Sequence, residues 1–133
     1  GGEENFEMAD VMKIGHRLIE LVKAQKFTQA LDELYADDVV SIEARGDETM
    51  PARMEGIKAI RGKADWWIGC HEIHGIECEG PFPNGDRFAV VMGLDVTARE
   101  GPTAGQRMQF KEVCLYTVRD GKIAEESFFY HFG

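Results

Sequence analysis

Acidic residues in apolar surroundings give this chain its clearest route to chemistry. Glu43 stands near the end of a short apolar segment beside a polar loop, and Glu112 stands among apolar residues of a longer one. Carboxylates are seldom placed among apolar side chains unless they are paired or used. A carboxylate in an apolar pocket has a raised pKa, which suits a general base. Histidine changes charge near neutral pH, so His74 is a third candidate acid or base.

Each of these candidates also has a structural interpretation. Glu43 can instead be a solvated charge at the end of a strand. The alternative for Glu112 is a buried ion pair with Arg53 or Arg107. The residue types alone leave these alternatives open, so the elements that position the carboxylates decide between them.

The segment from Met108 to Phe132 predicts two long strands joined by a tight turn at Arg119–Lys122. The Asp-Gly pair in this turn supplies the positive φ angles that a two-residue hairpin needs. Alternate residues of a strand share a face, which places Glu112 among apolar and aromatic neighbours. We expect the same face, with one helical tryptophan, to form the wall of a binding pocket. Its members are Trp67, Phe110, Cys114, Tyr116, Glu126, Phe128 and Tyr130.

The remaining chain predicts helices first and strands last. Apolar residues at helical spacing, start signals, alternation and turn residues mark these elements. We expect helices over 5–25 and 28–35, a strand over 39–44, a polar loop over 45–55, a helix from 55, and strands over 71–80 and 87–97 separated by a turn at 81–86. This order favours an α+β fold over a parallel α/β fold.

Three stretches also resemble a known family. They are the helix-to-strand junction Leu34–Asp38, the helix start Glu55-Gly56-Ile57, and the strand end Tyr116-Thr117-Val118 followed by Arg-Asp-Gly-Lys-Ile. Together they resemble the SnoaL-like branch of the nuclear transport factor 2-like superfamily. That superfamily also holds polyketide cyclases, steroid Δ5-isomerases and limonene epoxide hydrolase. The resemblance implies a cone-shaped, curved antiparallel sheet packed around three helices of the N-terminal half, with an apolar pocket at the open end. It also implies a homodimer formed through the sheet.

Only some functional residues of the family have a counterpart in this sequence. Glu43 aligns with the carboxylate that moves a proton between carbons in steroid isomerases. The acid of steroid isomerases and SnoaL-type cyclases aligns with Cys114, and Glu112 lies one strand repeat away on the same face. The tyrosine that donates to the oxyanion falls near Leu18, which cannot donate. We therefore do not expect a steroid isomerase, and the residue set of limonene epoxide hydrolase does not map onto this chain.

Composition and length limit the number of domains and the classes of partner that we expect. At 133 residues, we expect one SnoaL-like domain over 1–133, with residues 1–5 as a disordered or processing remnant. The net charge of −9 argues against nucleic acid, and no apolar run is long enough to span a membrane. Three cysteines without a secreted framework favour reduced thiols in the cytoplasm.

The sequence predicts no metal and no cofactor. The run Cys70–His74 with Cys78 lacks the His-Glu-x-x-His spacing of zinc enzymes, and Gly101–Gly105 is a turn with no helix behind it to hold a phosphate. The leading hypothesis is a cofactor-independent proton-transfer enzyme, an isomerase or aldol-type cyclase, acting on a small apolar carbonyl compound. In this hypothesis Glu43 or Glu112 is the base and Tyr130 or His74 the donor. The alternatives are a non-catalytic protein that binds a small molecule in the same cone, and an interaction module whose pocket is filled by side chains.

Overall fold

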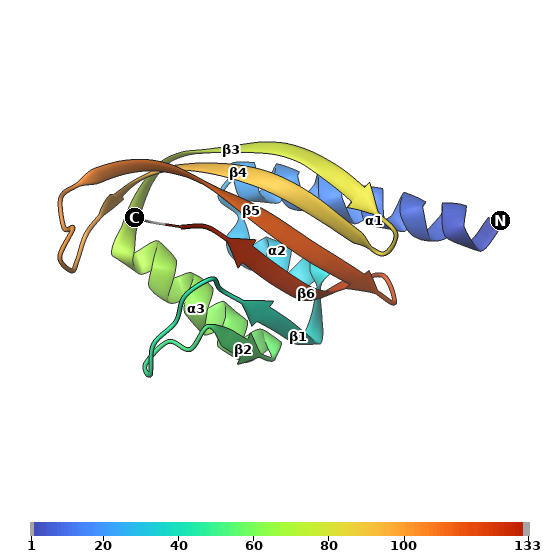
Figure 1. Ribbon diagram of the computed structural model, residues 1–133, viewed down its shortest axis with the longest axis horizontal. Coiled ribbons are helices and arrows are strands. Elements are labelled where there is room, and N and C mark those ends of the chain that lie inside the picture. The colour runs from blue at the N-terminus through green and yellow to red at the C-terminus, as the bar shows by residue number, and fades with distance from the viewer. Residues whose placement is uncertain (1, 132–133) are drawn as a thin grey trace.

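The computed structural model describes residues 2–131, and the side chains of residues 8–131. It contains three helices and one six-stranded sheet (Figure 1). The helices are α1 (Gly2–Lys23), α2 (Phe27–Leu34) and α3 (Ile57–Cys70). The strands are β1 (Tyr35–Ile42), β2 (Arg53–Glu55), β3 (His71–Asn84), β4 (Arg87–Ala98), β5 (Arg107–Arg119) and β6 (Lys122–Phe129), in the sheet order β2-β1-β6-β5-β4-β3. The predicted α+β class is confirmed.

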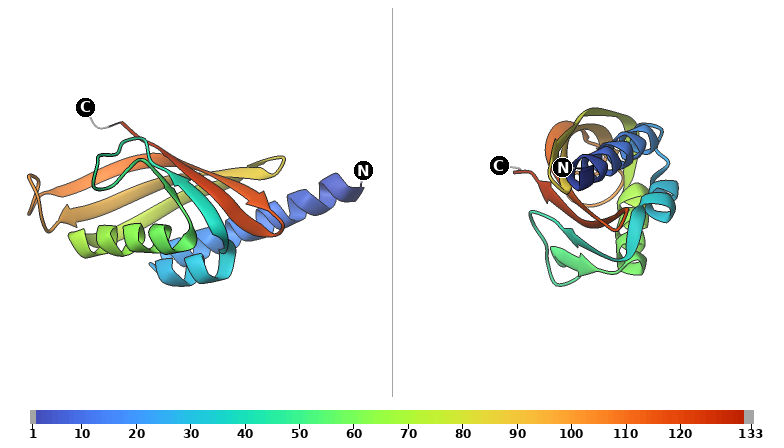
Figure 2. Two further views of the ribbon diagram at one scale, coloured as in Figure 1. Left: turned by 90° about the horizontal axis from the view of Figure 1, so that it is seen from below. Right: turned by 90° about the vertical axis from the view of Figure 1, so that its right-hand side faces the viewer.

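The sheet is strongly curved and does not close on itself. Its outermost strands are β2 and β3. Seen along the long axis in Figure 2, the strands β3 to β6 curl around α1, and α2 and α3 cover the open side of the curl. The helices therefore cover the concave face of the sheet, which is the arrangement expected for a cone-shaped sheet packed around helices.

Two features of the sheet differ from the expectation. First, β1 pairs with β6 in the parallel direction, with Val40 opposite Glu125, whereas we expected an antiparallel sheet. A parallel pair needs a long crossover connection, and here β2, α3 and three strands separate the partners in the sequence. Second, the loop expected over 45–55 ends in β2, where Met54 pairs with Ser41. Three residues are too few to show any periodicity.

The ends of some helices and strands also differ from the predicted ones. The helix α1 begins at Gly2 and so includes residues expected to precede the ordered part, while Gly1 and Phe132 lie outside the described residues. Strand β3 continues to Asn84, through the proline-rich stretch that was expected to be a turn. It can do so because β3 is an edge strand and a register shift between Glu79 and Phe82 accommodates Pro81.

The terminal hairpin forms as the sequence predicts. Asp120 and Gly121 have φ angles of 54° and 75°, the left-handed conformations of a two-residue type I′ turn. The ladder between β5 and β6 has a register shift between Thr117 and Val118, and beyond it Tyr116 lies opposite Glu126 and Cys114 opposite Phe128. Carboxylate and aromatic side chains of the two strands thereby share the concave face.

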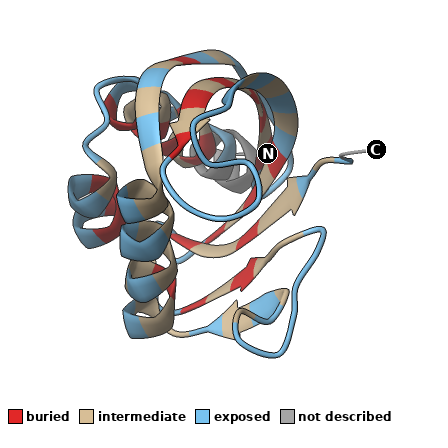
Figure 3. Ribbon diagram, turned by 90° about the vertical axis from the view of Figure 1, so that its left-hand side faces the viewer, coloured by how far each residue is buried: buried red, intermediate tan, exposed pale blue. Residues whose placement is uncertain are grey.

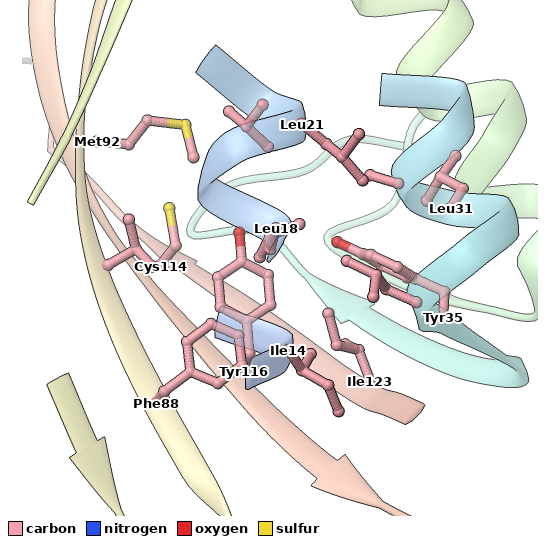
Figure 4. Packing of buried hydrophobic residues seen from close by; sticks show 14 of the residues in the cluster. Ile14, Leu18, Leu21, Leu31, Tyr35, Phe88, Met92, Cys114, Tyr116 and Ile123 are labelled. Carbon is pink, nitrogen blue, oxygen red and sulfur yellow. The ribbon is translucent and has the colours of Figure 1, made fainter. Parts of the chain in front are cut away.

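The core lies between the concave face and α1. Every second residue of β4, starting at Phe88, is buried, and the buried residues line the inside of the curl in Figure 3. In Figure 4, Leu18 and Leu21 of α1 lie between Met92, Cys114 and Tyr116 of the sheet and Leu31 and Tyr35 on the other side. The rings of Phe88 and Tyr116 stack with centroids 4.9 Å apart. This packing leaves a cavity toward α3 instead of filling the cone.

Candidate functional site

A cavity of about 590 Å³ lies between the sheet and the three helices. Most of its wall is apolar and comes from all three helices and from β4 and β5. The apolar wall includes Leu18, Val22, Phe27, Leu31, Ile60, Trp67, Met92, Leu94 and Phe110. Glu43, Lys63, Glu112, Glu126, Tyr35 and Tyr130 add polar groups. A mostly apolar cavity of this size with a few converging polar groups is the usual form of a small-molecule site.

Glu126 is the centre of a buried hydrogen-bond network. Its side chain is only 4% exposed, and its carboxylate accepts one bond from the Tyr35 hydroxyl and another, of 2.6 Å, from Ser41 Oγ. Burial raises the pKa of Glu126, while these two hydrogen bonds and the charge of Lys63 oppose the rise. Burial also raises the pKa of Tyr35, and the charge of Glu126 adds to it. Tyr35 therefore stays protonated and can keep donating to the carboxylate.

Lys63 extends this network toward the loop that follows β1. Its side chain is 12% exposed, and Nζ donates to Ser41 Oγ over 2.5 Å and to Glu43 Oε1 over 3.0 Å. The other oxygen of Glu43 accepts a bond of 3.1 Å from the Tyr130 hydroxyl. Both oxygens of Glu43 are thus engaged. The result is one continuous chain of hydrogen bonds from Tyr35 to Tyr130.

Glu112 lies outside this chain but faces the same space. Its hydrogen-bond partner is Cys114, with Sγ 3.6 Å from Oε1, a weak bond. Burial raises the pKa of Glu112 to about 7, the negative charges of Glu43 and Glu126 add to the rise, and Lys63 opposes it. Glu112 therefore exchanges its proton near neutral pH, as a general acid or base must.

The structure brings most of the predicted site residues together. Of these residues, the ones in the cavity wall are Glu43, Trp67, Phe110, Glu112, Tyr116, Glu126, Phe128 and Tyr130. Cys114 points inward but is fully buried behind the wall, where burial and the charge of Glu112 raise the pKa of its thiol. Neither arginine that was considered as a partner reaches Glu112, because Arg53 pairs with Glu55 and Arg107 with Asp95.

His74 does not reach the cavity. Its exposed ring lies on the convex face, with Nε2 2.7 Å from Thr97 Oγ1. A register shift between Ile73 and Gly75 explains this position, because both His74 and Gly75 oppose Asp95 across the ladder. A bulge of this kind moves every later residue to the other face of the strand. His71 precedes this shift and lies on the same face as Ile73, and its ring stacks on Trp67 with ring centroids 4.4 Å apart.

Three residues of the network were not among the predicted site residues: Lys63, Ser41 and Tyr35. A signal for Lys63 was present, because it lies three residues after Ile60 and four before Trp67, on the apolar stripe of its helix. A lysine in that stripe predicts a partner inside the fold. Ser41 and Tyr35 gave no comparable signal, since both fit an ordinary strand.

The structure gives two further negative findings. Among residues 2–131, no group of three or more His, Cys, Asp or Glu side chains is arranged to hold a metal ion. No helix in the described part of the chain is long and apolar enough to cross a membrane. Cys70, Cys78 and Cys114 are free thiols.

Comparison with known proteins defines the class. The SnoaL-like domain family matches residues 9–130, and the chain belongs to this family. A crystal structure from Mesorhizobium loti, described as a candidate SnoaL-like polyketide cyclase and also as a carbohydrate phosphatase, is 41% identical. The match covers 89% of this chain and 97% of that one, with a TM-score of 0.80. No curated protein sequence matches the chain.

Two more distant structures share the fold. One is an LEH-like epoxide hydrolase of M. tuberculosis, which is 15% identical over 94% of this chain and 85% of that one, with a TM-score of 0.69. The other is a computationally designed binder of 17-OHP, which is 21% identical over 92% of this chain and 94% of that one, with a TM-score of 0.71. At such identities the likeness concerns the fold alone. One scaffold therefore serves catalysis in one relative and binding in another.

Proposed function

We propose that this protein is a cofactor-independent enzyme that moves a proton at the carbon beside a carbonyl group of a small apolar compound. The overall reaction is an isomerisation or an aldol-type cyclisation. The observation that carries the proposal is the position of Glu112. Its carboxyl group faces an apolar cavity, has only a weak described hydrogen bond, and has a pKa of about 7. A group with these properties is suited to accept a proton from carbon and to return it.

In the proposed reaction, ionised Glu112 accepts the proton from the carbon next to the carbonyl. The electrons of the broken C–H bond form an enolate. The ammonium group of Lys63 stabilises the enolate oxygen, because it is the cation nearest to the carboxylate cluster and carries three N–H groups. Protonated Glu112 then returns the proton to a different carbon in an isomerisation. In a cyclisation, the enolate carbon instead attacks a second carbonyl, whose oxygen takes up the proton.

The experiment that tests this function is exchange of the acidic C–H protons of β-tetralone in deuterated buffer, followed by NMR. We expect the wild-type protein to accelerate exchange, with the rate rising as pH increases through about 7 because the base must be ionised. Glu112→Gln is expected to lose at least about a hundredfold of this rate. Glu77→Gln removes the same charge from an exposed position of β3 and serves as the matched control. Equal rates for wild type and Glu112→Gln would contradict the assignment.

The alternative function is binding without catalysis. It is supported by the hydrogen-bond network, in which Glu126, Ser41, Lys63 and Glu43 satisfy one another and so need no substrate. A binding protein would be stabilised by apolar ketones without accelerating proton exchange. Two measurements with β-tetralone separate the two functions: the change in melting temperature reports binding, and the exchange rate reports catalysis.

We also propose that the protein forms a homodimer through the convex face of the sheet. An apolar patch there consists of Phe82, Ala89, Val91, Val113, Leu115 and Phe129. Val113 and Phe129 are neighbours across β5 and β6 and are 42% and 53% exposed. Apolar side chains grouped in this way on a sheet face are typical of an interface.

Phe129→Glu is expected to convert the dimer into a monomer, because a charge in the patch would be buried without a partner. We expect the dissociation constant measured by analytical ultracentrifugation to rise at least about a hundredfold. Met8→Glu places the same charge on an exposed residue of α1 and is the control. A wild-type protein that stays monomeric at high concentration would overturn this interface.

A further inference from the structure

The polar end of the cavity is unusually rich in carboxylates. Glu43 lies just after β1, Glu112 on β5 and Glu126 on β6, and all three line the cavity. Their mutual influence is visible in the pKa of Glu112, which the charges of both other carboxylates raise. The cavity walls from α1, α2 and β4 carry no charge. These walls are formed by Leu18, Val22, Phe27, Ala30, Leu31, Met92 and Leu94.

Two cationic side chains line the described cavity, but its carboxylates outnumber them, so the wall is negatively charged when Glu112 is ionised. Lys63 already donates to Glu43 and Ser41. Arg45 is exposed and belongs to the loop after β1, together with Asp47, which brings a negative charge of its own. A ligand anion that enters with its charged group inward would therefore meet three carboxylates and one engaged ammonium. Like charges brought together out of water repel each other strongly, which weakens binding.

A neutral oxygen-bearing group meets suitable partners in the same place. The Lys63 ammonium has three N–H groups, of which Ser41 and Glu43 accept two. Its Nζ also lies 5.3 Å from the centroid of the Phe128 ring, and a ligand oxygen would compete with this contact for the third N–H group. Protonated Glu112 adds an O–H donor below pH 7. The apolar walls take up the rest of the ligand.

We propose that the cavity selects neutral compounds with an apolar body and a single carbonyl or hydroxyl end, and that the cluster of Glu43, Glu112 and Glu126 rejects carboxylates and phosphate esters of the same size. This inference rests on the cavity being the site of the proposed function. The inference adds the charge of the substrate to the proposed function. It also gives Glu112 a second role, in selecting the substrate. Charge exclusion holds whether or not the bound ketone reacts.

The test uses two probes that share one bicyclic body, β-tetralone and the corresponding tetralin carboxylate, with binding measured by calorimetry at pH 8 and pH 6. At pH 8 we expect the carboxylate to bind at least about tenfold more weakly than the ketone. At pH 6 the difference is expected to shrink, because Glu112 is then protonated while the ligand stays ionised. The other titratable groups coupled to Glu112 are Glu43, Lys63, Glu126, Cys114, Tyr116 and Tyr130, so a variant of Glu112 itself is needed to assign the pH effect to this residue.

Two variants sharpen the test. Glu112→Gln is expected to raise the affinity for the carboxylate, relative to that for the ketone, about tenfold at pH 8. Glu77→Gln, which changes the net charge equally, is expected to change neither affinity. If the carboxylate binds as tightly as the ketone to the wild-type protein at pH 8, the inference is overturned, even if Glu112→Gln does not fold. Selective ketone binding without deuterium exchange would instead reject the proposed catalysis and leave the charge selection standing.

Discussion

Glu126→Leu is expected to lower the free energy of unfolding by about 3 kcal/mol, because it removes the acceptor of two buried hydroxyl groups. Tyr35 and Ser41 both donate to this carboxylate, and Ser41 is fully buried. Each hydroxyl left without an acceptor costs about 1–3 kcal/mol. Part of that loss is offset because the substitution also removes a carboxylate whose burial is unfavourable. Urea denaturation at pH 7 measures the difference.

Glu126→Gln is the matched variant, because an amide keeps the shape of the side chain and one acceptor oxygen. It is expected to lose less than half as much stability as Glu126→Leu. Glu125→Leu, at the neighbouring position on the convex face, controls for the loss of a charge from β6. Equal stability of Glu126→Leu and the wild-type protein would show that the network contributes nothing to the fold.

Glu112→Gln is expected to have the opposite effect and to stabilise the protein at pH 8. The folded-state pKa of Glu112 is raised from 4.5 to about 7, so the folded protein holds a proton that the unfolded chain releases. Stability therefore falls as pH rises from about 4.5 to about 7 and stays lower above that range. This rise in the pKa of Glu112 lowers the free energy of unfolding by about 3 kcal/mol at pH 8. Glutamine has no proton to lose, so the variant avoids this cost.

The pH dependence provides the control for this second prediction. Glu112→Gln and wild type are expected to be about equally stable at pH 4.5, with the difference growing as pH increases toward 8. Asp95 and Glu33, whose ion pairs lower their pKa values to about 2, are present in both proteins, so their contribution cancels in this difference. A difference that stays constant from pH 4.5 to pH 8 would show that Glu112 does not titrate near 7. A wild type more stable than the variant at pH 8 would show that the carboxylate is a structural partner.

The sequence predicted the fold where local patterns were long. The alternation of β4, the stripe of α3 and the Asp120-Gly121 turn each extend over enough residues, or use specific enough ones, to define an element. It failed where pairing depends on distant segments. The parallel contact of β1 with β6 and the three residues of β2 are set by tertiary packing, which no local pattern records.

The candidate site shows the same division. Glu112 and Glu126 could be placed on the concave face because each alternates with aromatic residues along its own strand. Glu43 could be placed because it lies beside the short strand. The register shift between the two strands of the hairpin was not predicted. His74 was misplaced, since a single extra residue in β3 reverses the faces and alternation cannot reveal it. Lys63 was overlooked because long, charged side chains on helices are normally solvated, and only the position of its partners shows that it is not.

The two edges of the sheet bear on how copies of this protein can associate. An unpaired edge strand invites other strands to add to it and leads to aggregation. Here one edge, β2, is only three residues long, and the other, β3, carries two bulges and the prolines Pro81 and Pro83. Neither edge offers a long, regular row of backbone groups to a neighbouring chain. The sheet is thereby protected against growth into fibrils from either side, and the dimer proposed above uses its convex face instead of an edge.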